Sequence, residues 1–358
     1  MQSVQFINGP GTVENPVLVG PAISVTLASK AGIVPLGAKA FSLDVKIHSN
    51  VKGAAAGDVR LSLPPGWNST PTKAPFQIAS DGQDYPLSFV VHPGSLAQQV
   101  YKITAVAEYG GHSYKQGYVE TGYQGLRPYN LYMPATYRAT GVDVRVAPSL
   151  NVGYVVGSGD GVPEALQEIG VSVHFLSDQD LAAADLSHYD AIVLGIQSYS
   201  SRPALTTDNG RLLDYVKSGG ALIVQYNNSK ADYGPYPLSL DYGEGPSTVM
   251  DEHSAVQILE PNNPLLSWPN KITQKDFQGW VEERGHSFMT TWDPHYQALV
   301  EMHDPGQVPQ KGGLLYARYG KGVFVYASLA LYRQFTEGVP GAYRMFANLI
   351  SVGRAPKS

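Results

Sequence analysis

Carboxylates, imidazoles and a phenol in the C-terminal half of the chain could carry acid–base or nucleophilic chemistry. His303 and Asp304 are adjacent and directly follow an apolar run, so they could form an acid–base dyad, although such pairs also cap turns. Glu283 offers another carboxylate in an acidic segment. Tyr226 ends a second apolar run. Because the reference pKa of a phenol is about 10, Tyr226 would need a strong base beside it to attack a carbonyl.

Weak candidates for a metal site lie in the same half of the chain. Asp251 and His253 are two residues apart, and His286 follows the acidic segment; carboxylate and imidazole groups are ligands that zinc accepts. The spacing defines no site, because no two histidines are four residues apart, as they would be on one helix face. Salt bridges and loop hydrogen bonds are the alternative. We expect no cofactor, and a divalent metal stays a secondary possibility.

Tyrosines and tryptophans are dense in the C-terminal half and are mixed with amide and charged groups. Sugar recognition needs flat apolar faces beside fixed hydrogen-bonding groups, so this composition favours a carbohydrate site, although many of these aromatic residues could instead belong to the core. The predicted ligand-binding residues are Gln197, Tyr199, Arg202, Gln225, Tyr226, Asn227, Trp280, Glu283 and Arg284.

These side chains need a scaffold, and residues 190–229 provide its centre. Two apolar runs, 191–196 and 221–226, flank a segment whose apolar residues recur at helical spacing, which predicts a strand, a crossover helix and a parallel strand. A further strand is expected from residue 152. Right-handed crossovers then place the three strands side by side and parallel.

Ligand sites in open α/β sheets gather where the parallel strands end. We therefore expect residues 157–160, 197–202 and 225–228 to form the floor of one cleft. Its walls would come from residues 233–237 and 276–286. The alternative for Trp280 and Arg284 is that they simply pin a long loop to the sheet.

Domain organisation follows from a change in periodicity. Residues 1–125 alternate polar and apolar positions between Gly, Pro, Asn and Asp, which predicts an immunoglobulin-like β-sandwich with Trp67 in its core. Residues 126–149, rich in tyrosine and proline, read as a connector. Residues 150–358 read as an α/β domain with a parallel, flavodoxin-like sheet.

Several motifs in the C-terminal half carry a resemblance to a known family. Residues 276–285 (DFQGWVEERG), 301–306 (EMHDPG), 312–315 (GGLL) and 338–344 (GVPGAYR) resemble the C-terminal region of large bacterial PIG-L-type (LmbE-like) N-acetylglucosaminyl deacetylases. The resemblance covers nearly all of residues 15–352. It implies a β-sandwich followed by a domain of the class I glutamine amidotransferase type. It also implies a deacetylase domain in a longer parent chain, and an extracytoplasmic location.

The chain departs from this family at both chemical centres. The deacetylase zinc site rests on a His-Pro-Asp-Asp motif, which this sequence lacks. Aligned on the amidotransferase pattern, Tyr226 stands where the catalytic cysteine belongs, and the chain contains no cysteine at all. The α/β domain is therefore similar to trehalose-utilisation (ThuA-like) proteins, in which the fold persists without the cysteine triad.

Composition narrows the remaining function classes. A net charge of −5 with 15% charged residues gives no basic surface for nucleic acid, and no apolar run is long enough for a membrane span, so we expect a soluble chain. Two interpretations remain. The favoured one is a non-catalytic accessory region of a glycan-active protein that binds carbohydrate in the cleft. The alternative is a hydrolase that cleaves an ester, glycosidic or phosphoester bond with cleft carboxylates and histidines, alone or with a metal.

Overall fold

The computed structural model describes residues 2–7, 11–16, 19–123, 129–228, 233–241, 243 and 246–356. Strands make up 37% of it and helices 19%, so the fold is mostly β, with several sheets. The chain forms two compact units. The first contains residues 1–31 and 37–141, and the second contains residues 32–36 and 142–358.

The first unit is built from antiparallel sheets. One sheet has the order β3 (Ile23–Leu27), β5 (Phe41–Ser49), β9 (Asp84–His92) and β7 (Asn68–Thr70), and a second contains β14 (Thr136–Val142), β10 (Val100–Tyr109), β6 (Ala55–Ser62) and β8 (Ala74–Ile78). β11 (His112–Tyr114) pairs with β10, β12 (Gln116–Thr121) pairs with β13 (Tyr129–Pro134), and β1 (Gln2–Ile7) pairs with β2 (Gly11–Pro16). The strand β4 spans Ala31–Pro35.

Strand alternation sets the core of this unit. Along β5, Leu43, Val45 and Ile47 are buried while the residues between them face outward, which is the period of two that a half-buried strand requires. Trp67 is buried with its ring edge toward Phe41, at 6.1 Å between ring centroids, so its expected role in the core is confirmed.

The segment expected as a connector is more regular than its composition indicated. It contains all of β13 and β14, and β14 pairs with β10 in antiparallel register from Val100 opposite Thr140 to Thr104 opposite Thr136. Prolines at the end of β13 and before β15 obscured this alternation in the sequence. Residues 124–128, at the start of the predicted connector, lie outside the described residues.

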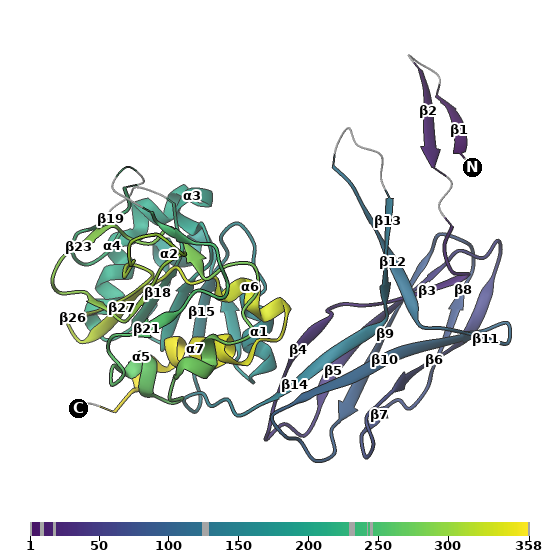
Figure 1. The fold of residues 1–358 in the computed structure, drawn as a ribbon, viewed down its shortest axis with the longest axis horizontal. Helices are drawn as coiled ribbons and strands as arrows, with labels where there is room; N and C mark the ends of the chain where they lie inside the picture. Colours follow the sequence, from purple (N-terminus) through teal and green to yellow (C-terminus); the bar gives the residue numbers. More distant parts are fainter. Residues whose placement is uncertain are drawn as a thin grey trace. The chain divides into compact units, whose positions relative to one another are not determined.

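The second unit is organised on a mixed seven-stranded sheet (Figure 1). Its order is β16 (Val173–Phe175), β15 (Val152–Val155), β17 (Ala191–Leu194), β18 (Ala221–Gln225), β27 (Gly322–Ala327), β26 (Leu314–Tyr319) and β24 (Gln297–Ala298). The first five strands are parallel, β26 runs antiparallel to β27, and β24 runs antiparallel to β26. The expected parallel arrangement of the strands that start at residues 152, 191 and 221 is therefore confirmed.

Helices cover both faces of this sheet. Successive residues of one strand enter different cores: Ile223 packs in the core that contains α7 (Pro340–Ser351), and Leu222 packs in the core that contains α4 (Pro203–Ser218). α1 (Val162–Glu168) belongs to the first core and α2 (Asp178–Ala183) to the second, whereas α3 (Ser198–Ser201), α5 (Pro264–Ser267) and α6 (Leu331–Thr336) are short. Among the helices described, none has the length and apolar character to cross a membrane.

Residues 227–270, rich in tyrosine, proline and glycine, read in the sequence as an irregular stretch, and residues 298–302 read as a strand. The first stretch instead contains three short strands, each paired with a strand further along the chain: β19 (Leu238–Ser239) with β23 (Thr291–Trp292), β20 (Thr248–Val249) with β22 (Gly285–His286), and β21 (Val256–Ile258) with β25 (Val300–Met302). β25 lies within the predicted strand. A 3-10 turn, η1 (Gln274–Phe277), precedes Trp280. These pairs bring residues 283–286 to the end of β27, where Gly285 bridges Leu329.

Candidate functional site

Three aromatic side chains meet where the central parallel strands end. Tyr226 directly follows β18, and its ring lies against the imidazole of His286, with 3.9 Å between ring centroids and 58° between planes. The ring of Tyr332, at the start of α6, is 5.7 Å from Tyr226. β22 positions His286, so this group joins residues from three separate parts of the chain.

Charged side chains complete the group. Arg333 Nε donates to Glu283 Oε1 at 2.6 Å, and its Nη1 donates to Glu282. His286 Nε2 lies 3.6 Å from the same Glu283 oxygen and 3.4 Å from the Tyr332 hydroxyl. We call these residues the strand-end cluster: Tyr226, Glu282, Glu283, His286, Tyr332 and Arg333.

The cluster is buried at its base and open at its rim. The Glu283 side chain is 4% exposed, whereas the exposure rises to 22% for His286, 36% for Arg333 and 60% for Glu282. The guanidinium group also lies over the Tyr332 ring, with 5.2 Å from Cζ to the centroid. A ligand that approached from solvent would first meet Glu282, Arg333 and the partly exposed His286.

Burial and neighbouring charges shift the protonation equilibria of the cluster. Burial lowers the pKa of His286; the Glu283 carboxylate opposes this shift and Arg333 adds to it. Burial, followed by the hydroxyl of Tyr226, raises the pKa of Tyr332. Burial acts to lower the pKa of Arg333, but the hydrogen bond and the charge of Glu283 outweigh it, so that pKa is raised. At neutral pH the imidazole is therefore uncharged and the guanidinium is charged.

Backbone strain concentrates around the cluster. Among the described residues other than glycine, positive φ occurs at Gln197 (56°), Glu282 (66°), Ser287 (60°) and Ser149 (54°), and the first three adjoin this site. Gln197 N donates to the Tyr226 carbonyl at 2.9 Å. Each such conformation costs roughly 1–2 kcal/mol, and strain of this kind gathers at functional sites.

Several predicted ligand-binding residues are instead committed to holding the loops that follow the strands. Asn227 is fully buried; its Oδ1 accepts from Tyr199 N at 3.0 Å, and its Nδ2 donates to Gln225 O at 2.9 Å. Gln225 Nε2 donates to the Tyr154 hydroxyl at 3.3 Å. The Tyr199 ring stacks on Tyr233 at 4.4 Å within the core. None of these groups faces an open cleft.

The Arg202 side chain is likewise committed to hydrogen bonds between loops. Its Nε donates to Asp178 Oδ1 at 2.9 Å, and its Nη1 reaches the carbonyls of Val156 and Leu176 at 3.4 Å. The guanidinium therefore joins the loops after β15 and β16 to the start of α4. Its role is to hold these elements together.

The expected cleft floor between the ends of β15 and β17 is closed. Ser158 N donates to the Ile196 carbonyl at 2.9 Å, and a Cβ atom at Gly157 would lie 2.0 Å from that oxygen. Only glycine allows the two loops to approach so closely. The predicted floor is therefore closed between Gly157 and Ile196, where direct backbone contact leaves no room for a ligand.

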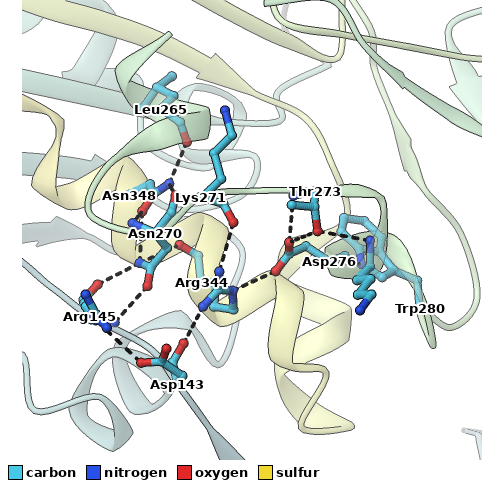
Figure 2. Close-up of polar contacts among 11 residues, drawn as sticks. Asp143, Arg145, Leu265, Asn270, Lys271, Thr273, Asp276, Trp280, Arg344 and Asn348 are labelled. Carbon is cyan, nitrogen blue, oxygen red and sulfur yellow. Dashed lines mark hydrogen bonds and ion pairs between the residues drawn. The ribbon is translucent and has the colours of Figure 1, made fainter. Parts of the chain in front are cut away.

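Trp280 and Arg284 hold the long segment in place, which is the structural role considered as the alternative to ligand binding. Trp280 Nε1 donates to the Asp276 carbonyl at 2.9 Å, and Figure 2 shows the Asp276 side chain bonded in turn to Thr273 and Arg344. Arg284 donates to the carbonyls of Ser254 and Phe277, and its Cζ lies 5.4 Å from the centre of the Trp280 ring. Both side chains are buried and tie the parts of the long segment together, and the Asp276 carboxylate links this segment to α7 through Arg344.

His303 and Asp304 do not meet as an acid–base pair. His303 Nδ1 is 3.0 Å from the Asp304 carbonyl oxygen, while the Asp304 carboxylate accepts from Met250 N at 3.0 Å and Asp251 N at 2.9 Å. The carboxylate therefore anchors the loop before β21. The pair has the geometry of a loop anchor.

The weak metal candidates are not brought together. Asp251 Oδ1 accepts from the His253 backbone at 2.8 Å, the His253 ring points to solvent with 84% of its side chain exposed, and His286 belongs to the strand-end cluster. Within the part of the chain that the structure describes, no three His, Asp or Glu side chains converge in a way that could hold a metal ion.

Three cluster residues, Glu282, Tyr332 and Arg333, were not among the predicted site residues. Tyr332 and Arg333 follow β27 by a few positions, so the same strand-end principle that selected Tyr226 could have found them. Glu282 lies next to Glu283 in the acidic segment, and the pairing of β20 with β22 places this segment at the site.

Comparisons with known proteins do not show which family the chain belongs to. No family model matches the chain, and no curated protein matches it. Among solved structures, it is similar to a cold-adapted β-galactosidase from Rahnella sp. R3 with 15% identity over 61% of this chain and 32% of that chain, at a TM-score of 0.35. The Calx CBD1 domain matches with 10% identity over 34% of this chain and 98% of that domain, at a TM-score of 0.22. The chain thus spans about a third of the β-galactosidase, and these likenesses are too low to carry an argument about function.

Proposed function

We propose that the chain is a non-catalytic accessory region of a glycan-active protein and that the strand-end cluster binds carbohydrate. The observation that carries the proposal is the contact of Tyr226 with His286 beside Tyr332 and the fixed Arg333. Sugar rings bind where aromatic faces adjoin hydrogen-bonding groups of fixed orientation. The partly exposed rim provides access for such a ring.

The cluster suits binding better than nucleophilic catalysis. A tyrosine nucleophile needs its hydroxyl within hydrogen-bonding reach of a base. Here the ring of Tyr226 lies against that of His286 at a tilt of 58°, and no hydrogen bond joins the Tyr226 hydroxyl to the imidazole among the described residues. Arg333 is engaged by two carboxylates, so it is poorly placed to stabilise a developing negative charge.

The finer architecture is part of the same proposal. The order β16-β15-β17-β18-β27 corresponds to the 2-1-3-4-5 order of flavodoxin-like sheets, which supports an amidotransferase-type domain. The two antiparallel sheets of the first unit support an immunoglobulin-like sandwich. With the sequence motifs, these features favour kinship with PIG-L-type and ThuA-like proteins, a deacetylase domain in a longer parent chain, and an extracytoplasmic location.

A hydrolase is the second candidate, and one observation favours it. Burial lowers the pKa of His286, which keeps the imidazole neutral at pH 7, and Glu283 lies 3.6 Å from its Nε2. A neutral imidazole oriented by a carboxylate is the arrangement of a general base. Its substrate would be an ester, glycoside or phosphoester that enters at the exposed rim.

One pair of assays separates the two candidates. The purified protein is applied to an array of bacterial and plant glycans, and in parallel to chromogenic acetyl esters, glycosides and phosphoesters. Glycan binding without turnover supports the accessory role. Turnover that His286→Gln abolishes would establish the hydrolase instead, and an absence of both binding and turnover contradicts both candidates.

A further inference from the structure

A recess lies at the N-terminal ends of the central parallel strands, opposite the strand-end cluster. It has a volume of about 510 Å³ and is open to solvent. Its walls come from the end of α2, the segment before β17, the last turns of α4 and the residues after α7. Asp190 and Gly220, which directly precede β17 and β18, lie on its floor, so it occupies the N-terminal edge of the parallel strands. We call it the lower groove.

The groups that line the lower groove are held in place before any ligand arrives. Arg211 donates to the Ala184 carbonyl at 2.7 Å, and Arg354 Nε donates to Asp190 Oδ1 at 2.7 Å. The Tyr215 hydroxyl donates to the Tyr189 carbonyl at 3.2 Å. Fixed groups bind more tightly because less conformational entropy is lost when the ligand enters.

A glycine shapes the floor. A Cβ atom at Gly220 would lie 2.0 Å from Cζ of Tyr215, so any other residue would displace the Tyr215 ring and break its two carbonyl contacts, to Tyr189 and Ala221. The Tyr215 ring therefore packs directly over the Gly220 backbone, and this close approach fixes the ring at the floor of the lower groove.

The chemistry of the lining indicates what the ligand should be. Two arginines and three aspartates surround the groove, so an anion would face carboxylates and a cation would face guanidinium groups. Asp214 makes no hydrogen bond or ion pair with any other described residue and can accept from a ligand. A hydroxyl group can both donate and accept a hydrogen bond, so an uncharged ligand rich in hydroxyls can pair with the arginines and the aspartates alike.

We propose that the lower groove is a binding site for a neutral polyhydroxylated ligand, namely an oligosaccharide segment. Its volume lies within the roughly 300–1,000 Å³ of small-molecule sites. Tyr189 offers an aromatic surface at its wall, and Asp214 offers a free acceptor. The site is separate from the strand-end cluster and does not depend on the function proposed for that cluster.

The test titrates cellobiose, maltose, xylobiose and diacetylchitobiose against the full chain by calorimetry and ligand-observed NMR, with putrescine and glucuronate as charged probes. Asp214→Ala and Tyr189→Ala each remove one groove contact and are expected to weaken binding of the preferred disaccharide by about fivefold or more. Asp208→Ala, on the same helix but outside the groove, and Tyr226→Ala, in the strand-end cluster, should leave this affinity unchanged.

The proposal would be overturned if no neutral disaccharide bound at about 10 mM, a concentration well above the millimolar Kd of weak sites. It would also be overturned if both groove variants bound the disaccharide as tightly as the wild type, or if only putrescine or glucuronate bound. If a disaccharide binds and only Tyr226→Ala weakens that binding, the lower groove is not the binding site, and the proposal for the strand-end cluster stands. The thermal midpoint of each variant, measured in the same buffer, shows whether a loss of binding reflects unfolding.

Discussion

Asn270 and Asn348 each donate a hydrogen bond to the other. The Asn348 Nδ2 donates to the Asn270 carbonyl at 2.7 Å, and the Asn270 backbone N–H donates to Asn348 Oδ1 at 2.9 Å (Figure 2). Asn348 also donates to the carbonyl of Leu265, and no part of its side chain is exposed. The pair fastens the segment after α5 to α7.

Asn348→Ala should therefore be strongly destabilising. It leaves two buried carbonyls and one buried N–H without their partner, and we expect the free energy of unfolding to fall by about 2–4 kcal/mol. Chemical denaturation measures the change. Asn262→Ala, at an exposed position near α5, is the control and should shift it by less than about 0.5 kcal/mol. Equal effects of the two substitutions would show that the network does not stabilise the second unit.

His286 should make the protein less stable in mild acid. Its folded pKa lies below the ordinary value because of burial, so the unfolded chain takes up the proton first as the pH falls. The contribution of His286 is present above about pH 6.5 and is lost as the pH falls below it. Unfolding free energies of the wild type and His286→Gln between pH 8 and 5 should show a shallower loss in the variant. An imidazole that titrates above its ordinary pKa by NMR contradicts this account.

Glu168, unlike His286, should make the protein less stable as the pH rises. Burial raises the pKa of its carboxyl, although hydrogen bonds from the Tyr343 hydroxyl at 2.7 Å and from Ile33 N at 3.1 Å oppose the shift. The folded state therefore binds its proton more tightly than the unfolded chain, and stability falls as the pH rises from about 4.5 through the folded pKa. Glu168→Gln keeps an acceptor without the charge and should flatten this fall. An unchanged slope between pH 4 and 7 would count against a raised pKa.

Glutaminase activity should be absent. Tyr226 occupies the end of β18, where an amidotransferase carries its cysteine, and the chain contains no cysteine. A phenol without a hydrogen-bonded base is a poor nucleophile at neutral pH. Release of ammonia from glutamine is measured with a coupled assay. Activity that disappears in Tyr226→Phe would contradict the view that this strand end does not catalyse acyl transfer.

The sequence was sufficient to predict three central strands of the seven-stranded sheet, because local patterns mark them, and their parallel direction followed from right-handed crossovers. Continuous apolar runs marked the parallel strands from residues 152, 191 and 221, and alternation marked β5 and its neighbours. The strands β13 and β14 escaped prediction because prolines and tyrosines in that segment outweighed a weak alternation.

The candidate site was predicted in part. Strand ends are visible in a sequence, so Tyr226 could be selected, but the direction of each side chain depends on contacts between distant residues. Trp280 and Arg284 turn inward because Asp276, Phe277 and Ser254 provide carbonyls for them, and no local pattern contains that information. Asn227 is likewise drawn into the loop after β17 by Tyr199.

The central claim is that Tyr226 forms part of a carbohydrate site, and one measurement tests it most directly. The glycan that the array selects is titrated by calorimetry against the wild type, Tyr226→Ala and Tyr319→Ala, the last at the opposite end of the sheet, where it pairs with Gly322. We predict that Tyr226→Ala weakens binding by about tenfold, as expected for the loss of one aromatic contact, and that Tyr319→Ala leaves the affinity unchanged. Equal affinity of the wild type and Tyr226→Ala, with both proteins folded, would contradict the account.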